Sequence, residues 1–216
     1  DATGIAHYLE HVLFKGTEEL GTSDYKTEKI YLDSISKLYE DLSKTNLASK
    51  RSLIQSEINR ISIKASEYAI PNEFDKLLKQ IGSTNINAFT NQDYTAYYNG
   101  FPPNQIEKWL ELYSHRFQNP VFRLFQSELE TVYEEKNIFM DNPLNNLIQE
   151  VLKNVFKNHP YGQQSVLGKV EHLKNPSLQK MYKFYKDYYV PNNMVLALSG
   201  DFNSEKIIPI INEKFK

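Results

Sequence analysis

Residues 3–17 read TGIAHYLEHVLFKGT. Apolar residues recur there at intervals of three and four positions, which predicts a helix that buries one face. Gly16 stands just beyond the last of them, where helices commonly take a C-terminal glycine. The sequence therefore predicts a helix from Thr3 to Phe14, with an apolar stripe formed by Ile5, Leu9, Val12 and Leu13.

The same helix carries two histidines, His7 and His11, four positions apart. Positions i and i+4 share one face of a helix and lie about 6 Å apart along its axis. Two imidazoles placed in this way can reach one zinc ion at Zn–N distances of about 2.0–2.1 Å. Glu10 flanks that face, so its carboxylate can act as a general base on a water molecule. The alternative is a pair of surface histidines on an amphipathic helix.

Composition excludes several other classes of protein. The 216 residues carry a net charge of −2, whereas a nucleic-acid-binding protein usually has a clear basic excess. The sequence contains no cysteine, which excludes disulfides and thiolate metal sites. No apolar run approaches the roughly 20 residues that a membrane-spanning helix needs. Because residue 1 is Asp, six positions before the first histidine, we interpret the sequence as part of a longer polypeptide.

A catalytic zinc ion usually has three protein ligands and one open position. The sequence offers two kinds of candidate for the third ligand. One is a further histidine, and the remaining three are His115, His159 and His172. The other is a carboxylate, which is equally acceptable chemically.

The helix that contains Val132 provides a geometric criterion for choosing a carboxylate. With Val132 at the centre of its apolar face, Glu128 and Glu135 fall within roughly 60° of that centre. Glu130 and Glu134 fall on the opposite side, where they are ordinary solvated charges. A carboxylate that faces a core needs a partner, so Glu128 and Glu135 require either a metal ion or a salt bridge at the edge of the core.

The remaining periodicity predicts an α+β fold. Residues Tyr25–Tyr68 contain two helical stripes separated by polar residues 44–46, which predicts an antiparallel helical hairpin that is self-contained enough to be an insertion. Two-residue alternation on either side of residues 91–93 predicts a pair of strands. Residues 159–162 are expected to begin a loop, and residues 194–198 to form a short buried strand. Helices and paired strands without regular β-α-β alternation favour α+β.

At this point the motifs resemble a known family. His7-x-x-Glu10-His11, followed by residues 14–17, resembles the inverted zinc-site metallopeptidases of the pitrilysin and insulin-degrading-enzyme family, to which the mitochondrial processing peptidases belong. Further landmarks of that family match in order along the chain: Gly82, Asn87-Ala88-x-Thr90 with Asp93, Thr95 and Tyr97, the pair Glu128 and Glu135, His159-Pro160-Tyr161-Gly162 with Gly168, and Pro191 through Gly200-Asp201.

The resemblance implies a role for each candidate residue. His7, His11 and Glu135 would bind Zn²⁺, Glu10 would be the general base, and Glu128 would be a supporting carboxylate beside the ligands. The implied fold is a mainly antiparallel sheet packed with helices, which is one half of a clamshell. The implied activity is that of an endopeptidase that hydrolyses extended peptides or small unfolded proteins with zinc-activated water.

The resemblance also implies how a substrate is held. Residues 85–90 would be an edge strand that receives the substrate backbone by β-augmentation, with Asn87 and Ala88 as contact points. Asn87 could instead be only a polar residue near a turn, because Asn is a weak strand former. The implied partners are the peptide or unfolded protein substrate and the C-terminal half of the enzyme, on the same polypeptide or as a separate subunit.

Two departures from the family pattern are visible. Glu135 stands 124 residues after His11, which is more than is usual, and the excess corresponds to the hairpin at residues 25–68. Such an insertion need not disturb the site, since the cost of closing a loop grows slowly with its length. The strands that normally precede the motif are also missing. We therefore predict one metallopeptidase domain over residues 1–216, without its first strands, that holds zinc and hydrolyses little by itself.

Two alternatives remain at this stage. The chain could be a non-catalytic family member that acts as a scaffold or binding subunit, although such relatives typically lose the motif residues that are present here. Alternatively, the helical hairpin could be the functional part, as a protein-interaction module beside a vestigial zinc site.

Overall fold

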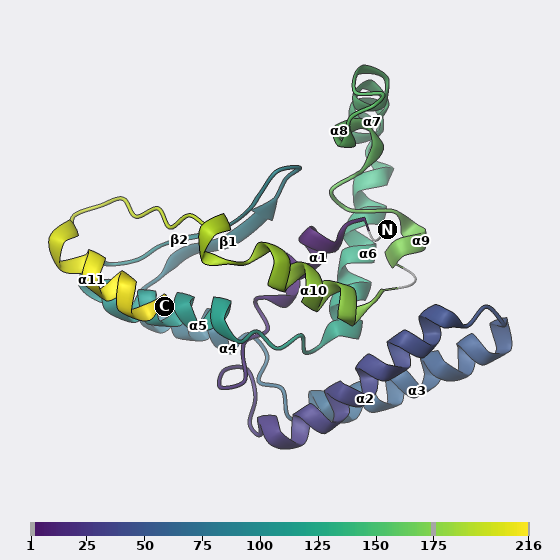
Figure 1. Ribbon diagram of the computed structural model, residues 1–216, viewed down its shortest axis with the longest axis horizontal. Helices are drawn as coiled ribbons and strands as arrows, with labels where there is room; N and C mark the ends of the chain where they lie inside the picture. The colour runs from purple at the N-terminus through teal and green to yellow at the C-terminus, as the bar shows by residue number, and fades with distance from the viewer. Residues whose placement is uncertain (1–2, 174–175, 216) are drawn as a thin grey trace.

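The computed structural model describes residues 3–173 and 176–215, so positions 1, 2, 174, 175 and 216 of the predicted domain lie outside the described residues. Figure 1 shows a chain dominated by helices, with one small antiparallel sheet. The expected α+β class is therefore confirmed. The elements are α1 Ile5–Val12, α2 Tyr25–Lys44, α3 Ala48–Ser66, α4 Glu73–Gln80, β1 Thr84–Thr90, β2 Thr95–Gly100, η1 Pro103–Gln105, α5 Ile106–Gln118, α6 Phe125–Asp141, α7 Pro143–Val155, α8 Pro160–Gln163, α9 Val170–Leu173, α10 Leu178–Tyr188, η2 Pro191–Asn193 and α11 Ser204–Lys214.

Helix α1 lies at the centre of the molecule, where it contacts α6, α10 and both strands. Its apolar face is buried, since Leu9 and Val12 have no exposed surface and Tyr8 and Leu13 have almost none. The chain enters α1 through Gly4, whose φ of 81° lies in the left-handed region. A Cβ on Gly4 would come within 2.9 Å of the Cα of Gly168, so only glycine fits this crossing.

Helices α2 and α3 form the expected antiparallel hairpin, which extends to the lower right in Figure 1. The side chain of Asp24 caps α2 by accepting a hydrogen bond from the backbone N–H of Thr27. The hairpin is not a detached arm, because one face of it joins the same core as α1, α6 and α10. Its buried members of that core are Ile35, Tyr39, Leu42, Ile58 and Ala65.

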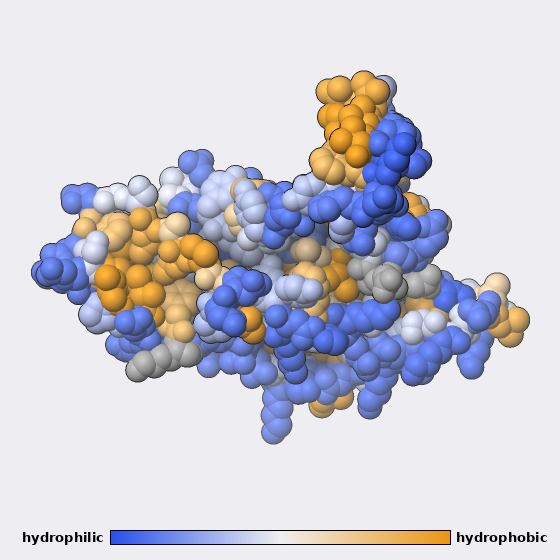
Figure 2. Space-filling model, turned by 45° about the horizontal axis from the view of Figure 1, so that its top comes forward, coloured by the Kyte–Doolittle hydropathy of each residue, from blue (hydrophilic) through white to orange (hydrophobic). Residues whose placement is uncertain are grey.

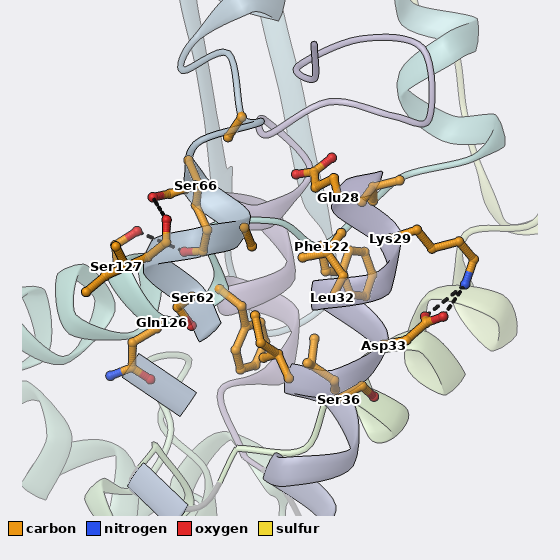
Figure 3. Close-up of a pocket in the computed structure, with 18 of the residues that line it drawn as sticks. Glu28, Lys29, Leu32, Asp33, Ser36, Ser62, Ser66, Phe122, Gln126 and Ser127 are labelled. Atoms are coloured by element: carbon orange, nitrogen blue, oxygen red, sulfur yellow. Dashed lines mark hydrogen bonds and ion pairs between the residues drawn. The ribbon is translucent and has the colours of Figure 1, made fainter. Parts of the chain in front are cut away.

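A cavity of about 540 Å³ lies between this hairpin and the start of α6 (Figure 3). Apolar side chains such as Leu32 and Phe122 line it together with serine hydroxyls. At its edge, Lys29 pairs with Asp33 one turn further along α2. None of the candidate site residues lines this cavity.

A second core joins α4, α5 and α11 beneath the strand pair. In the sheet, β1 and β2 pair antiparallel, with Asn87 opposite Tyr98 and Thr90 opposite Thr95. The register is irregular between Thr84 and Asn87, and Asn85 has a φ of 51° there. The regularly paired part of β1, residues 87–90, follows this irregularity, and β1 packs against α1.

A buried arginine fixes the end of α1 against the start of α6. The Nε of Arg123 donates to Glu28 Oε1 at 2.9 Å, and neither side chain is exposed by more than 1%. The two Nη groups of Arg123 donate to the carbonyls of Lys15, Thr17 and Leu20 at 2.8–2.9 Å. Because this guanidinium is hydrogen-bonded both to Glu28 of α2 and to the loop that follows α1, it sets how α1 and the start of α6 lie against each other.

Two expectations about local structure were wrong. Residues 194–198 are not a buried strand, because Val195 is 95% exposed. Within the described residues the sheet consists of β1 and β2, and residues 194–198 do not pair with either. A strand-like sequence is buried only where another strand pairs with it, so the segment instead forms one wall of an open groove beside β2. Residues 159–162 do not begin an irregular loop, because the single-turn helix α8 begins at Pro160, with His159 as its cap.

Helix α7 has no buried residue. It carries a row of exposed apolar side chains, which account for the hydrophobic knob at the upper right of Figure 2: Leu144, Leu147, Ile148, Val151 and Val155. None of the described helices is long and apolar enough to cross a membrane.

Candidate metal centre

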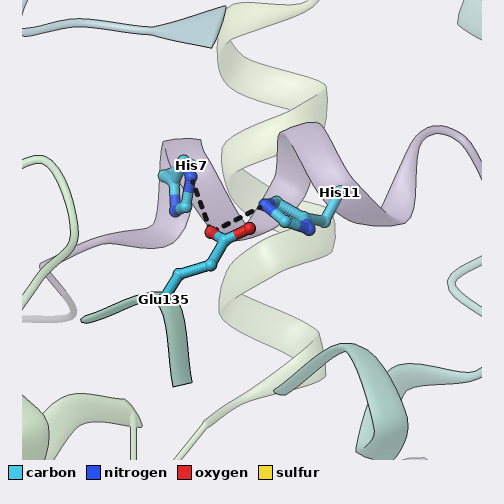
Figure 4. A group of neighbouring side chains, drawn as sticks. All are labelled: His7, His11 and Glu135. Carbon is cyan, nitrogen blue, oxygen red and sulfur yellow. Dashed lines mark ion pairs between the residues drawn. The ribbon is translucent and has the colours of Figure 1, made fainter. Parts of the chain in front are cut away.

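Helices α1 and α6 bring the two predicted histidines and a predicted glutamate together. Oε2 of Glu135 lies 3.6 Å from Nε2 of His7 and 3.4 Å from Nε2 of His11. Figure 4 shows the carboxylate of Glu135 between the two rings. Within the described residues, these three form the group of ligand-type side chains that could hold a metal ion, with all ligand atoms within 4.8 Å of one another.

The donor set fits a zinc ion. Ligand atoms at the corners of a tetrahedron around zinc, about 2.1 Å from it, lie about 3.4 Å apart. The two distances from Glu135 Oε2 are already close to that value, and closure of the His7–His11 pair needs only small side-chain movements. Two imidazoles and one carboxylate also leave a fourth position open, which is the ligand count of catalytic zinc sites.

The pKa of His7 is lowered to about 4, first by burial of its ring and then by the nearby charge of His11. The imidazole of His7 is therefore neutral at physiological pH, which is the form that binds metals. Its Nδ1 is buried without a hydrogen-bond partner in the described part of the chain. His7 thus presents Nε2 toward Glu135 with no second group orienting its ring.

His11, in contrast, is held on both sides. Its Nε2 faces Glu135, whereas its Nδ1 lies 3.5 Å from Oε2 of Glu128. Burial alone would lower the pKa of His11, but the hydrogen bond to Glu128 and the charges of Glu135, Glu128 and Glu10 raise it overall. A carboxylate on the far nitrogen is the usual way in which a metal-binding histidine is oriented.

Glu128 also receives a cation. Nζ of Lys15 lies 2.6 Å from its Oε1, and both side chains are about 15% exposed. Burial would raise the pKa of Glu128, but hydrogen bonds from His11 and Lys15 outweigh that effect and keep it below its usual value. Glu128 is therefore ionised beside His11, whereas Glu130 and Glu134 are exposed on the other face of α6.

Glu10 lies on α1, on the same helix as His7 and His11 and in contact with Thr90 of β1, and is only 7% exposed. The hydroxyl of Thr90 donates to Oε2 of Glu10 at 2.5 Å, and Thr95 lies 3.0 Å from the same hydroxyl. Burial raises the pKa of Glu10, and the hydrogen bond from Thr90 offsets part of that rise. A carboxylate with a raised pKa that keeps one oxygen free is suited to accept and return a proton.

Strand β1 has one open edge in the described part of the chain, because β2 occupies the other. The backbone N–H of Asn91 donates to the carbonyl of Tyr94, so Asn91 and Tyr94 form a hydrogen-bonded pair at the turn. Along an antiparallel ladder, hydrogen-bonded and non-hydrogen-bonded pairs alternate, and Ala88 stands opposite Tyr97 three pairs further on. Ala88 is therefore in a non-hydrogen-bonded pair, with its N–H directed to the open edge. Oδ1 of Asn87 accepts a hydrogen bond from that N–H at 2.8 Å.

The other three histidines do not join the group. Nδ1 of His172 accepts a hydrogen bond from the backbone N–H of Thr3, His159 caps α8, and His115 lies 3.8 Å from Glu19. Of the two kinds of third ligand that the sequence left open, the carboxylate is the one that lies beside His7 and His11.

Sequence reasoning missed two residues of the site. Thr90 was noted only as part of a motif, and its contact with Glu10 depends on how β1 packs on α1. Lys15 is part of the motif only as a member of residues 14–17, although it follows His11 by four positions. That interval, which already linked His7 to His11, is the signal that could have placed Lys15 on the same face.

An α+β fold that gathers two imidazoles and a carboxylate around one point, beside a buried second carboxylate, has the ligand arrangement of catalytic zinc sites in peptidases. Residues 56–168, more than half of the chain, match the family model described as insulinase (peptidase family M16). The chain therefore belongs to peptidase family M16. Residues 176–216 match a second model, described as the peptidase M16 inactive domain, and contain none of the candidate site residues.

Several curated proteins are similar to the chain. The zinc protease PqqE of Helicobacter pylori is 27% identical over 162 residues, which is 74% of this chain and 36% of that protein. The uncharacterized zinc protease YmfH of Bacillus subtilis is 32% identical over 69% of this chain and 35% of its own length. The mitochondrial-processing peptidase subunit beta of Dictyostelium discoideum is 21% identical over 98% of this chain and 35% of that protein.

Solved structures show the same fold. The crystal structure of a protease from Helicobacter pylori matches with a TM-score of 0.71 and 25% identity, over 99% of this chain and 40% of that one. The first half of the periplasmic protease PqqL from Escherichia coli matches with a TM-score of 0.63 at 16% identity. The chain thus spans 35–40% of the length of each of the proteins named here.

Proposed function

We propose that this chain is the zinc-binding part of an M16 endopeptidase, with His7, His11 and Glu135 as ligands and Glu10 as the general base. The observation that carries the proposal is the position of Oε2 of Glu135, within 3.6 Å of Nε2 of both histidines. The zinc proteases among its relatives support the same assignment.

Zinc bound by this group would supply a Lewis acid for the scissile carbonyl and for a water molecule. The chain's own contribution is the movement of a proton. Oε2 of Glu10 is held by Thr90, which leaves Oε1 to take a proton from the water that attacks the carbonyl carbon. Glu10 then returns the proton to the amide nitrogen as the C–N bond breaks, so the carboxylate is regenerated.

The substrate class follows from the open edge of β1. An extended peptide can add to that edge as a further strand, which requires main-chain groups and few particular side chains. Ala88 provides an N–H donor there, and Asn87 covers it until a substrate carbonyl takes its place. We therefore propose extended peptides or unfolded segments as substrates. Thr90 ends the same strand and holds Glu10, so the edge leads the peptide to the base.

The remaining parts of the proposal concern the whole protein. The chain covers 36% of the length of the zinc protease PqqE and 40% of the solved Helicobacter pylori protease. We therefore propose that a C-terminal half, on the same polypeptide or in a separate subunit, closes over the open site. We further propose that residues 1–216 form one catalytic domain without its first strands, and that residues 25–68 are an insertion in it.

Metal content and turnover of the full-length parent test this function together. Glu10→Gln should keep one zinc per chain by inductively coupled plasma mass spectrometry and lose hydrolysis of a peptide library. Glu19→Gln, an exposed glutamate outside the metal group, is the control and should keep both. A parent that binds no zinc and hydrolyses nothing would favour the non-catalytic scaffold instead, and a Glu10→Gln variant with unchanged turnover would show that Glu10 is not the general base.

A further inference from the structure

Donors on α1 and on the loop directly after it face two carboxylates on α6. His7, His11 and Lys15 follow one another at intervals of four residues, and Glu128 and Glu135 stand seven apart on α6. Each carboxylate lies between two of these three donors. Glu135 contacts both histidines, whereas Glu128 contacts His11 through Oε2 and Lys15 through Oε1.

We propose that Lys15 is a positioning residue of the metal centre, because its ammonium holds Glu128 in the orientation that supports His11. The inference rests on the proposed function, since it takes the His7–His11–Glu135 group to be a zinc site. Lys15 touches neither the ligand atoms nor the proposed base, so it acts only through Glu128.

The geometry explains how the effect would be transmitted. A histidine that binds a metal through Nε2 has one N–H left, at Nδ1, and an acceptor there fixes both the tautomer and the plane of the ring. Glu128 is that acceptor, at 3.5 Å from Nδ1 of His11. Lys15 occupies the other carboxylate oxygen at 2.6 Å, which leaves Glu128 a single way to face the ring.

Lys15 is itself held in place. Its backbone N–H donates to the carbonyl of Val12, and its carbonyl accepts a hydrogen bond from the buried Arg123 at 2.8 Å. The Lys15–Glu128 pair is about 15% exposed on each side, whereas the Lys29–Asp33 pair on α2 is more than half exposed. Ion pairs that are shielded from water and fixed in geometry transmit orientation better than flexible surface pairs do.

The two histidines differ in this support. Nδ1 of His7 is buried and has no hydrogen-bond partner among the described residues. Of the two rings, His11 is therefore the one whose orientation a carboxylate fixes, through Glu128 at its Nδ1. Loss of Lys15 should therefore affect zinc binding even though no ligand is changed.

Zinc affinity of the purified full-length parent, measured by competition with a chromogenic chelator, tests the inference. Lys15→Met keeps the length of the side chain and removes its charge. It should weaken zinc binding toward the lower end of the roughly 10–100-fold that loss of a direct outer partner such as Glu128 costs. Lys15→Arg should restore most of the affinity. Lys29→Met, which breaks the exposed pair on α2, should leave it unchanged.

A double variant separates positioning from plain stability. If Lys15 acts through Glu128, the Lys15→Met/Glu128→Gln chain should bind zinc no more weakly than Glu128→Gln alone. The thermal midpoint of each metal-free variant, followed by circular dichroism, shows whether it is folded. Unchanged affinity in folded Lys15→Met would overturn the inference, and so would a double variant in which the two losses add. If the full-length parent binds no zinc, both this inference and the proposed function fail. If it binds zinc equally well with and without the Lys15 ammonium, this inference alone fails.

Discussion

Oε2 of Glu135 lies 3.4 Å from Nε2 of His11, although 124 positions separate the two residues in the chain. The contact exists because α6 packs against α1, and Arg123 ties the beginning of α6 to the loop after α1. The whole helical hairpin lies between them in sequence and packs on the same core without entering the site.

Replacement of Glu135 by Gln should weaken zinc binding by more than the roughly 10–100-fold that loss of an outer partner costs, because a charged ligand becomes neutral. Isothermal titration of the metal-free chain with zinc measures this effect. Glu134→Gln is the matched control, since Glu134 is the next residue on α6 and is exposed. If Glu134→Gln lost zinc and Glu135→Gln kept it, the assignment of the third ligand would be wrong.

In the metal-free chain, the pKa values of the two histidines should be shifted in opposite directions from the ordinary value of an imidazole. Burial and the charge of His11 lower the pKa of His7 to about 4, and the carboxylates around His11 raise its pKa above 6.5. At pH 6, His7 should therefore be neutral and His11 mainly protonated. The Cε1–H resonances followed by NMR against pH check this, with His7→Ala to assign the signals. Coincident titrations near 6.5 would show that the rings are not buried side by side.

Glu28→Gln should destabilise the chain by about 3–5 kcal/mol, because it leaves the buried guanidinium of Arg123 without its carboxylate. Urea unfolding followed by circular dichroism measures the loss. Asp33→Asn removes a carboxylate from an exposed pair on the same helix and should cause no measurable change. Equal stability of the two variants would contradict the buried pair.

Ile58→Ala in α3 should cost about 2–5 kcal/mol, because Ile58 is only 1% exposed in the core that the hairpin shares with α1. Leu53→Ala in the same helix is the control, since Leu53 is 72% exposed. Differential scanning calorimetry would show a lower midpoint only for the first variant. A hairpin that unfolds separately, before the rest, would be a detached module and not part of this core.

Much of the site could be predicted because helix periodicity fixes which residues share a face. The four-residue interval placed His7 and His11 together, and the period of 3.6 separated Glu128 and Glu135 from Glu130. Contacts between distant elements could not be predicted in this way. Thr90 meets Glu10 only because β1 packs on α1, and no local pattern encodes that contact.

The charged residues of the core illustrate the same limit. Arg116 is fully buried, with its guanidinium carbon 4.0–5.1 Å from the centres of four aromatic rings, yet on sequence alone an arginine is expected at the surface. The wrong expectation for residues 194–198 has a related cause. Their alternation suits a strand, but burial depends on a neighbouring strand that a local pattern does not specify.

Anomalous diffraction at the zinc absorption edge, from crystals of the chain grown with zinc, tests the central claim most directly. The account predicts one strong peak, about 2.0–2.2 Å from Nε2 of His7, from Nε2 of His11 and from a carboxylate oxygen of Glu135. A peak elsewhere, or an ion that Glu135 does not touch, would contradict it.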